Sequence, residues 1–304
     1  MRYQQENTKH TPPIQFDNVP NYAAGRRAFL GTLGLGAAGA LIMAGTPGAA
    51  FAQAATPSAA DVFNFALNFE YLGAEFYLHA LNGSTLGAGD IEGTGTQGAV
   101  VGGHAVPFQD PLVRSIAQEF STDEVGHTRF LRSILGGARI ARPAIDLNNS
   151  FTAFARFAGL VPSTGTFDAF ANDNNFLLAA FVLEDVCVTA LKGASPLIRN
   201  NEFLEAAAGF IATEGYQAGI LRTLLAQREQ FTQAQQVSDL RDYFDGPSDI
   251  DQGIGTAQQV NIVPADANSI AFSRTPEQVR NIAYGTTNGQ PGGFFPNGLN
   301  GAVR

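Results

Sequence analysis

The sequence predicts an all-α protein built around a four-helix bundle. Four segments are long, rich in helix-forming residues and apolar at intervals of three and four, which is the helical period. Helix-start and helix-stop residues bound these segments, and no strand-rich block or internal repeat lies between them. Each segment also carries a glutamate in the middle of its apolar stripe. The sequence therefore favours a bundle whose core contains carboxylates.

The first 52 residues have the composition of an export signal. Arg26-Arg27 precede an apolar run, and residues 50–52 form an A-x-A cleavage pattern. The paired arginines resemble a twin-arginine signal, although Gly25 stands where Ser or Thr is usual. A membrane anchor is the alternative, since the run is about 18 residues long, the short limit for a span. We expect cleavage after Ala52 and export to the periplasm, the cell envelope or the medium.

The chain that remains after cleavage is long and acidic. Removing 52 of 304 residues leaves 252, enough for one large domain with an appendage. The leader holds four of the 18 basic and two of the 27 acidic residues, so the remainder has a net charge of −11. We therefore expect neither a nucleic-acid partner nor stable membrane insertion. The single Cys187 excludes an internal disulfide, so the core must hold the fold.

Local signals place the first two helices. The first is expected at 59–81, where apolar residues cover most sides, and Asn82-Gly83 ends it. A loop rich in Gly and Thr follows. The second helix should begin with Asp110 as N-cap and Pro111 at the first helical position, and should end at Gly136-Gly137.

The third and fourth helices follow a long connection. Residues 138–172 contain several turn signals and one minor helix, FTAFARFAGL. The third helix is expected at 174–192, stopped by Gly193, and the fourth at 201–229. We therefore place the bundle at 59–236.

The last segment, 237–304, differs in composition from the bundle. Gly, Asp, Asn and Pro dominate it, and one short helix is expected around 276–284. Thr275 would be its N-cap, Pro276 its first residue and Gln278 the partner in a capping box. We predict a loop-rich extension packed on the bundle.

The apolar stripes of the four helices share one unusual feature, an inward-facing acid near the centre. Like charges buried together disfavour ionisation, and each desolvated carboxylate is costly unless it is compensated. A pair of divalent cations would remove that cost. The spacing also matches di-metal carboxylate bundles, in which two helices give one Glu and two give Glu-x-x-His. The predicted ligands are Glu70, Glu124, His127, Glu184, Glu214 and Gln217, with Gln217 in place of the second histidine.

Other readings of neighbouring residues stay open at this point. Glu75 is the alternative to Glu70 as the metal ligand of the first helix, but it lies on a more polar stripe. Tyr77 either packs in the core or donates a hydrogen bond to a ligand. Cys187, three residues after Glu184, is interpreted as a small core residue that could approach the site.

Two further groups of polar residues give only weak signals. His79 and His104 are interpreted as solvated or capping histidines. Four aspartates resemble a calcium loop only loosely, because the ordered spacing and the terminal Glu are missing. They are Asp242, Asp245, Asp249 and Asp251.

Four stretches of the chain resemble the desiccation-related, ferritin-like family. They are LNFEYLGAEFY, STDEVGHTRFL, VLEDVCVTALKGA and YGTTNGQPGGFFPNGLNG. The resemblance covers about residues 61–301 and is strongest at the helices and the last twenty residues. It implies an exported protein with a ferritin-like bundle and a metal site, but no settled reaction.

Two hypotheses of function follow. In the first, the bundle binds one or two iron or manganese ions, without an organic cofactor, and oxidises ferrous iron or handles oxygen or peroxide. In the second, a metal-free bundle acts as a scaffold in stress protection. Two observations favour the second hypothesis: Gln217 stands in place of the second histidine, and the sequence has no Ser-His-Asp set or nucleotide fingerprint. A homodimer is compatible with both.

The first hypothesis predicts two unequal metal positions. Glu70, Glu124 and His127 should form the tighter one. The weaker position should lie near Glu184, Glu214 and Gln217, because an amide oxygen is a poorer donor than imidazole. Gln217→His is therefore expected to raise its occupancy.

Overall fold

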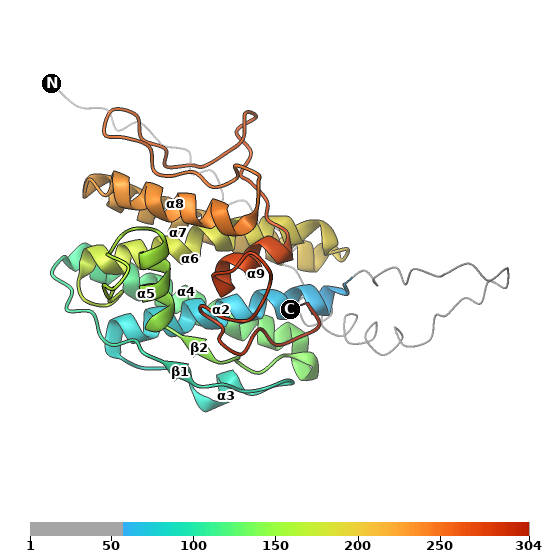
Figure 1. Cartoon of the computed structure of the whole chain (residues 1–304). Helices are drawn as coiled ribbons and strands as arrows, with labels where there is room; N and C mark the ends of the chain where they lie inside the picture. Colours follow the sequence, from blue (N-terminus) through green and yellow to red (C-terminus); the bar gives the residue numbers. More distant parts are fainter. Residues whose placement is uncertain (1–56, 304) are drawn as a thin grey trace, which may run out of the picture.

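The protein is a bundle of long helices with shorter elements around it (Figure 1). The computed structural model describes residues 57–303, so the export signal predicted at 1–52 lies outside the described residues. The four long helices are α2 (Ala59–Asn82), α4 (Pro111–Leu135), α6 (Asp173–Ala194) and α7 (Asn201–Gln227). The predicted all-α, four-helix class is confirmed.

The helix ends form where the sequence places start and stop residues. At the start of α2, Ser58 and Asp61 form a capping box, and Gly83 ends the helix in the left-handed conformation at φ 65°. At α4, the Asp110 side chain accepts a hydrogen bond from Leu112 N at 2.9 Å, which satisfies one free N–H of the first turn. Local chemistry thus fixes both ends of α2 and the start of α4.

The sequence predicted that Gly193 stops α6, but the helix continues through Gly193 to Ala194. The missing side chain of Gly193 serves a close approach instead. A Cβ at Gly193 would lie 2.0 Å from the carbonyl oxygen of Arg274. This glycine therefore lets the C-terminal segment lie directly against the end of α6.

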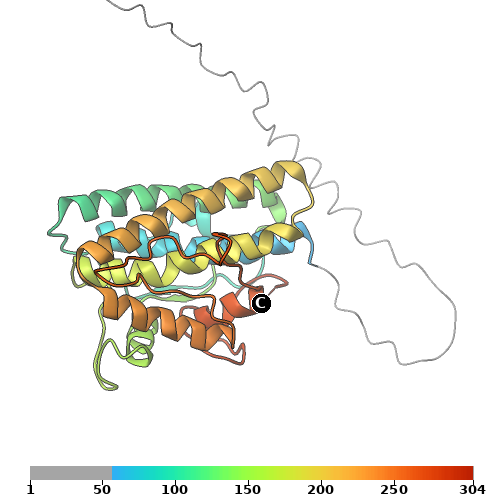
Figure 2. The same ribbon diagram turned by 90° about the horizontal axis from the view of Figure 1, so that it is seen from above.

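The four long helices pack as two pairs. α2 packs mainly on α4, α6 packs mainly on α7, and α2 also contacts α6. Figure 2 shows the four helices running side by side along the bundle. The apolar core fills the space between them, and several of its largest side chains are aromatic. Phe76 is fully buried and lies parallel to Phe176 at 5.5 Å between ring centroids.

Shorter elements lie in the connections between α2 and α6. They are α3 (Ala88–Ile91), β1 (Val100–Val101), the 3-10 turn η1 (Gly136–Ala138), β2 (Ile145–Asp146) and α5 (Asn149–Phe157). β1 and β2 pair in parallel, with Val100 opposite Ile145. α5 is the minor helix predicted from the sequence, whereas the strands were not predicted, since two residues are too short to show alternation.

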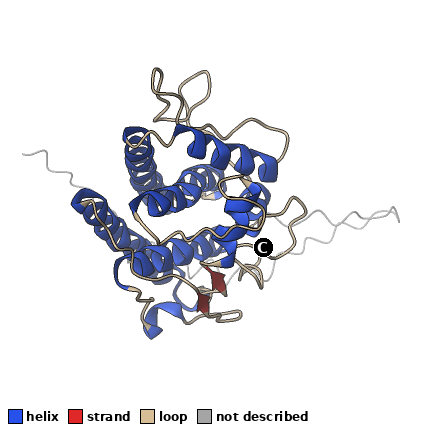
Figure 3. Cartoon of the chain, turned by 60° about the vertical axis from the view of Figure 1, so that its left-hand side comes forward, coloured by secondary structure: helices blue, strands red, loops and turns tan. Residues whose placement is uncertain are grey.

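The C-terminal segment contains more helix than the sequence analysis expected. η2 (Ser195–Leu197) joins α6 to α7, and α8 (Phe231–Asp245) and α9 (Pro276–Tyr284) follow the bundle. α9 and its Thr275 capping box are as predicted. α8 was missed because half of its inward face is polar. Figure 3 shows that blue helices dominate the described chain, that tan loops connect them, and that the strands, in red, are short.

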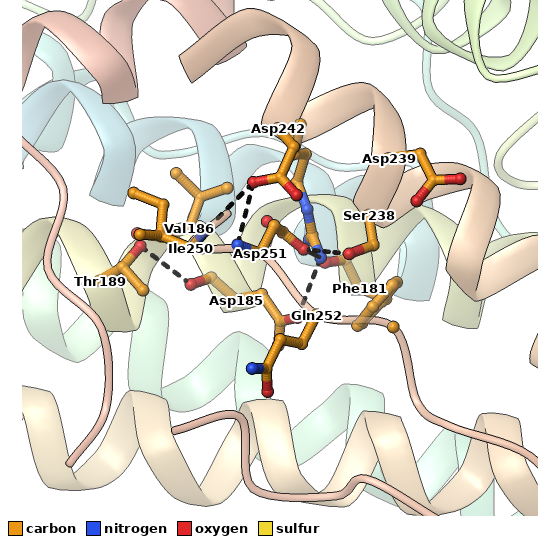
Figure 4. A network of polar contacts seen from close by, with 12 residues as sticks. Phe181, Asp185, Val186, Thr189, Ser238, Asp239, Asp242, Ile250, Asp251 and Gln252 are labelled. Atoms are coloured by element: carbon orange, nitrogen blue, oxygen red, sulfur yellow. Dashed lines mark hydrogen bonds and ion pairs between the residues drawn. The ribbon is translucent and has the colours of Figure 1, made fainter. Parts of the chain in front are cut away.

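A buried network of ion pairs joins α8 and the loops to the bundle. Arg241 of α8 donates to Asp185 of α6 at 3.0 Å and to Asp251 at 2.7 Å. Asp251 lies between α8 and Asp185 (Figure 4). Arg274 donates to Asp251 and to Asp245, both at 2.7 Å. The charges of these buried groups are therefore compensated within the fold.

The calcium-loop reading of the four aspartates has no support in this arrangement. Asp245 and Asp251 are engaged by arginines, and Asp242 accepts hydrogen bonds from the backbone amides of Ile250 and Asp251. Their role is to fasten the segment after α8. Within residues 57–303, none of the helices is long and apolar enough to cross a membrane.

Candidate metal centre

Each of the four long helices turns one glutamate into the same part of the core. The stripes place them there because residues three and four apart share one helix face. All four are nearly inaccessible to solvent, with exposed fractions between 1% and 5%. They are Glu70 of α2, Glu124 of α4, Glu184 of α6 and Glu214 of α7.

His127 is the centre of the first group of candidate ligands. Its Nδ1 lies 3.3 Å from Glu70 Oε2, 3.3 Å from Glu214 Oε1 and 3.9 Å from Glu124 Oε1. One donor atom from each of these four residues lies within 4.8 Å of the others. The Phe210 ring packs edge-on against the imidazole at 4.4 Å between centroids and fixes its orientation. The structure thus brings the predicted Glu-x-x-His pair together with Glu70.

A second group adjoins the first and shares one of its members. Glu184, Cys187 and Glu214 each offer a donor atom within 4.8 Å of the other two. Tyr77 donates a hydrogen bond to Glu184 and is itself fully buried. Both readings of Tyr77, core aromatic and hydrogen-bond donor, therefore hold. Glu214 is common to the two groups and is placed to bridge them.

Gln217 is buried near the centre but is only partly directed to it. Its Nε2 donates to Asp123 Oδ2 at 3.2 Å, and its Oε1 has no hydrogen-bond partner. Only 2% of the residue is exposed. The amide is therefore held by a neighbouring carboxylate on one side and has one free acceptor on the other.

Several buried polar atoms of the centre lack a hydrogen-bond partner. An unpaired buried polar atom costs about 1–3 kcal/mol, so a cluster of them needs a physical reason. A divalent cation would supply the missing partner, and carboxylate, imidazole and amide oxygen donors suit iron and manganese. The residues present thus fit a metal. The unpaired atoms are Glu124 Oε1, Glu214 Oε2 and Gln217 Oε1, whereas His127 Nδ1 and Glu70 Oε2 meet at 3.3 Å without a well-formed hydrogen bond.

The electrostatics of the centre favour binding a positive charge. Burial, reinforced by the neighbouring carboxylates, raises the pKa of Glu124 and of Glu184 well above the usual range. Burial by itself would lower the pKa of His127, but Glu214 and Glu70 outweigh it and raise that pKa to about 10. Without a cation the cluster therefore holds protons, and binding a metal would release them.

A glycine of α2 makes room for Glu124. A Cβ at Gly73 would lie 2.2 Å from Glu124 Oε2 and 2.9 Å from its Cδ. The long side chain of Glu124 can shift, so Gly73→Ala should cost little stability. In Gly73→Ala, however, the carboxylate of Glu124 would leave its place beside His127. We expect manganese affinity at this position to fall by about 10–100-fold, the usual cost of disturbing a ligand's support.

Gly209→Ala is the matched control for Gly73→Ala. Gly209 is also in a long helix, but nothing lies within 4 Å of the place a Cβ would take. This change should raise stability by about 0.5–1 kcal/mol and leave metal affinity unchanged. Titration calorimetry with Mn²⁺ gives both affinities. Equal affinities in the two variants would show that Gly73 does not position a ligand.

A small cavity connects the centre to the C-terminal segment. It has a volume of about 30 Å³ and is lined by Glu124, Glu184 and Cys187 on one side and by Ile282 and Phe294 on the other. A space of this size holds one or two water-sized molecules. The segment after α8 therefore lines this side of the metal centre.

The structure also decides between the open readings of nearby residues. Glu75 is fully buried, but it pairs with Arg142 and accepts from Thr85 Oγ1 at 2.6 Å, away from the predicted site. His79 is 9% exposed, so its reading as solvated is wrong. His104 is exposed and lies 3.0 Å from Asp168.

Cys187, which the sequence predicted to be a small core residue that could approach the site, joins the second group of donors. The signal was present, since Cys187 follows Glu184 with the spacing of the Glu-x-x-His pair. The contact of Asp123 with Gln217 could not be predicted from the sequence, because it joins two helices, α4 and α7, that are far apart in the chain.

Comparison with known proteins places these features in a family. The model of the ferritin-like domain matches residues 58–227. Ferritin-like catalase Nec2 from Nesocodon mauritianus is 28% identical over 277 residues, which cover 80% of this chain and 84% of that protein. Desiccation-related protein PCC13-62 from Craterostigma plantagineum is 30% identical over 243 residues, 72% of this chain and 75% of that protein. No solved structure matches significantly. With its four long helices and their shared carboxylate cluster, the chain belongs to the ferritin-like domain family.

Proposed function

We propose that this protein binds two divalent metal ions, of which at least one is iron or manganese, and breaks down hydrogen peroxide at them. The observation that supports it most is the pair of donor groups that share Glu214. Buried donor atoms without hydrogen-bond partners suit the binding of cations, and two neighbouring cations suit a substrate with two oxygen atoms. A relative named as a ferritin-like catalase adds weight to peroxide as the substrate.

The residues of the chain would contribute binding, shielding and orientation. Glu70, Glu124, His127 and Glu214 would hold one ion, and Glu184 with Glu214 the second. Bound iron or manganese would supply the redox chemistry that converts two molecules of peroxide into water and oxygen. Tyr77 orients Glu184 through its hydrogen bond. The cavity of about 30 Å³ beside Glu124 and Glu184 has the size that peroxide needs.

A metal-free scaffold is the second candidate function, and one contact favours it. The Gln217 amide, which stands in place of a second histidine, is engaged with Asp123. In this reading His127 pairs with Glu70 and Glu214 and needs no cation. The protein would then act through its surface in stress protection, as the name of the desiccation-related relative suggests.

Metal analysis separates the two candidates. The protein is purified without chelators, reconstituted anaerobically with ferrous or manganous ion, and assayed for metal content and for oxygen release from peroxide. We expect more than one equivalent of metal, with oxygen released only by loaded protein. Less than a tenth of an equivalent would contradict metal binding, and full loading without oxygen release would contradict the peroxide reaction alone.

We also propose that the protein is exported. This part is supported by the leader sequence, with its paired arginines and its A-x-A pattern at 50–52. N-terminal sequencing of protein recovered outside the cytoplasm should then begin at Gln53. A full-length chain in the cytoplasm would contradict it.

A further inference from the structure

We propose that Cys187, and not Gln217, completes the second metal position. The ligands there are the Cys187 thiolate and the carboxylates of Glu184 and Glu214. Because thiolate is a soft donor, this position should take a thiophilic divalent cation such as Zn²⁺ or Co²⁺ in preference to Mn²⁺. The inference rests on the proposed metal binding and adds to it a difference between the two positions.

The geometry of α6 carries the first step. Cys187 follows Glu184 by three residues, so the two side chains lie on one face of the helix. His127 follows Glu124 with the same spacing on α4. The Cys187 sulfur, one Glu184 oxygen and one Glu214 oxygen lie within 4.8 Å of one another. Zinc bonds of about 2.0–2.3 Å place donor atoms of one ion slightly closer than this, so small side-chain movements suffice.

An independent observation points to a ligand between these residues. Glu214 is 1% exposed, and its Oε2 has no hydrogen-bond partner. Its Oε1 is the atom that lies 3.3 Å from His127. Glu214 therefore has one oxygen near His127 and a second oxygen, buried and unpaired, that is available to the second position. A cation beside Glu184 and Cys187 would be its partner.

Cys187 also has open space in front of it, which an ordinary core residue lacks. It lines the cavity of about 30 Å³ together with Glu124 and Glu184. Gln217, in contrast, uses its amide nitrogen on Asp123. It can offer only a neutral oxygen, a weaker donor for zinc or cobalt than an anionic sulfur.

Cobalt is the probe that tests this assignment. Sulfur bound to Co²⁺ gives an intense near-ultraviolet charge-transfer band, whereas oxygen and nitrogen donors do not. Cys187 is the single cysteine of the chain, so such a band identifies it without a mutation. The full protein is titrated with Co²⁺, and cobalt content and absorption are recorded together. We expect the band to appear, Zn²⁺ to remove it, and an equal concentration of Mn²⁺ to leave it.

Two variants sharpen the result, and circular dichroism confirms that each is folded. Cys187→Ser should lose the band and about half of the bound cobalt, and Gln217→Ala should keep both. Cobalt bound by the wild type without the band would overturn the inference and leave metal binding intact. No binding of cobalt, iron or manganese would overturn both. Removal of the band by Mn²⁺ as readily as by Zn²⁺ would overturn the inferred preference of this position for zinc or cobalt over manganese. Cobalt content as low in Gln217→Ala as in Cys187→Ser would overturn the choice of Cys187.

Discussion

Replacing Glu214 by Gln is expected to remove most of the thermal stabilisation that metal gives this protein. Glu214 is the one residue common to both donor groups. One of its oxygens lies 3.3 Å from His127, and the other is buried without a hydrogen-bond partner. An amide at this place offers one neutral oxygen and a nitrogen that cannot bind a cation. Both positions should therefore lose affinity together.

The size of the effect follows from binding linkage. A ligand at 100 times its Kd stabilises the folded state by about 2.7 kcal/mol, so two ions give about 5 kcal/mol. For a protein of this size, 1 kcal/mol corresponds to about 2–4 °C in Tm. Metal should therefore raise the Tm of the parent by about 10–20 °C and that of Glu214→Gln by much less. Without metal, the variant should be somewhat less stable than the parent, because buried His127 loses one of its two carboxylate partners.

Scanning calorimetry with and without Mn²⁺ or Fe²⁺ measures this difference. Glu119→Gln is the matched control, since Glu119 lies on α4 with its side chain exposed. It should keep the full increase in Tm. A metal-induced increase that is the same in Glu214→Gln and in the parent would mean that Glu214 binds neither ion.

Replacing Arg241 by Met is expected to cost about 3–5 kcal/mol of unfolding free energy, the usual cost of breaking a buried ion pair. Arg241 is fully buried, donates to Asp185, Asp251 and the Phe181 carbonyl, and lies 4.5 Å from the Phe181 ring centroid. Methionine fills much of the volume but leaves two carboxylates less compensated.

Urea denaturation compares this variant with Arg129→Met. Arg129 is 62% exposed at its side chain and pairs with Asp90 at 2.8 Å, and exposed pairs contribute at most about 1 kcal/mol. The double variant Arg241→Met, Asp251→Asn should lose less than the sum of the two single losses, since each single variant leaves the other charge of this pair behind and the double variant does not. Similar losses for Arg241→Met and Arg129→Met would show that the buried network does not hold the segment.

The fold and the carboxylate cluster could be predicted because both depend on short-range patterns. The Asp110 cap, the Gly83 stop and the three-and-four spacing act within one or two turns of helix, so they can be read along the chain. Burial of Glu124 and Glu214 follows in the same way, since a residue on an apolar stripe is buried together with the other residues of that stripe. By itself, the sequence thus determined the helices, the core faces and the acids on them.

Contacts between distant segments decided the rest. The sequence gives no sign that Gln217 would turn its amide to Asp123, or that Gly73 would face Glu124. The inward face of α8 is partly polar, and its Arg241 is buried where it meets Asp185 and Asp251. Such pairings depend on how helices pack, which no local period encodes. The tertiary structure alone therefore decided which donors share a position and how the last segment closes over them.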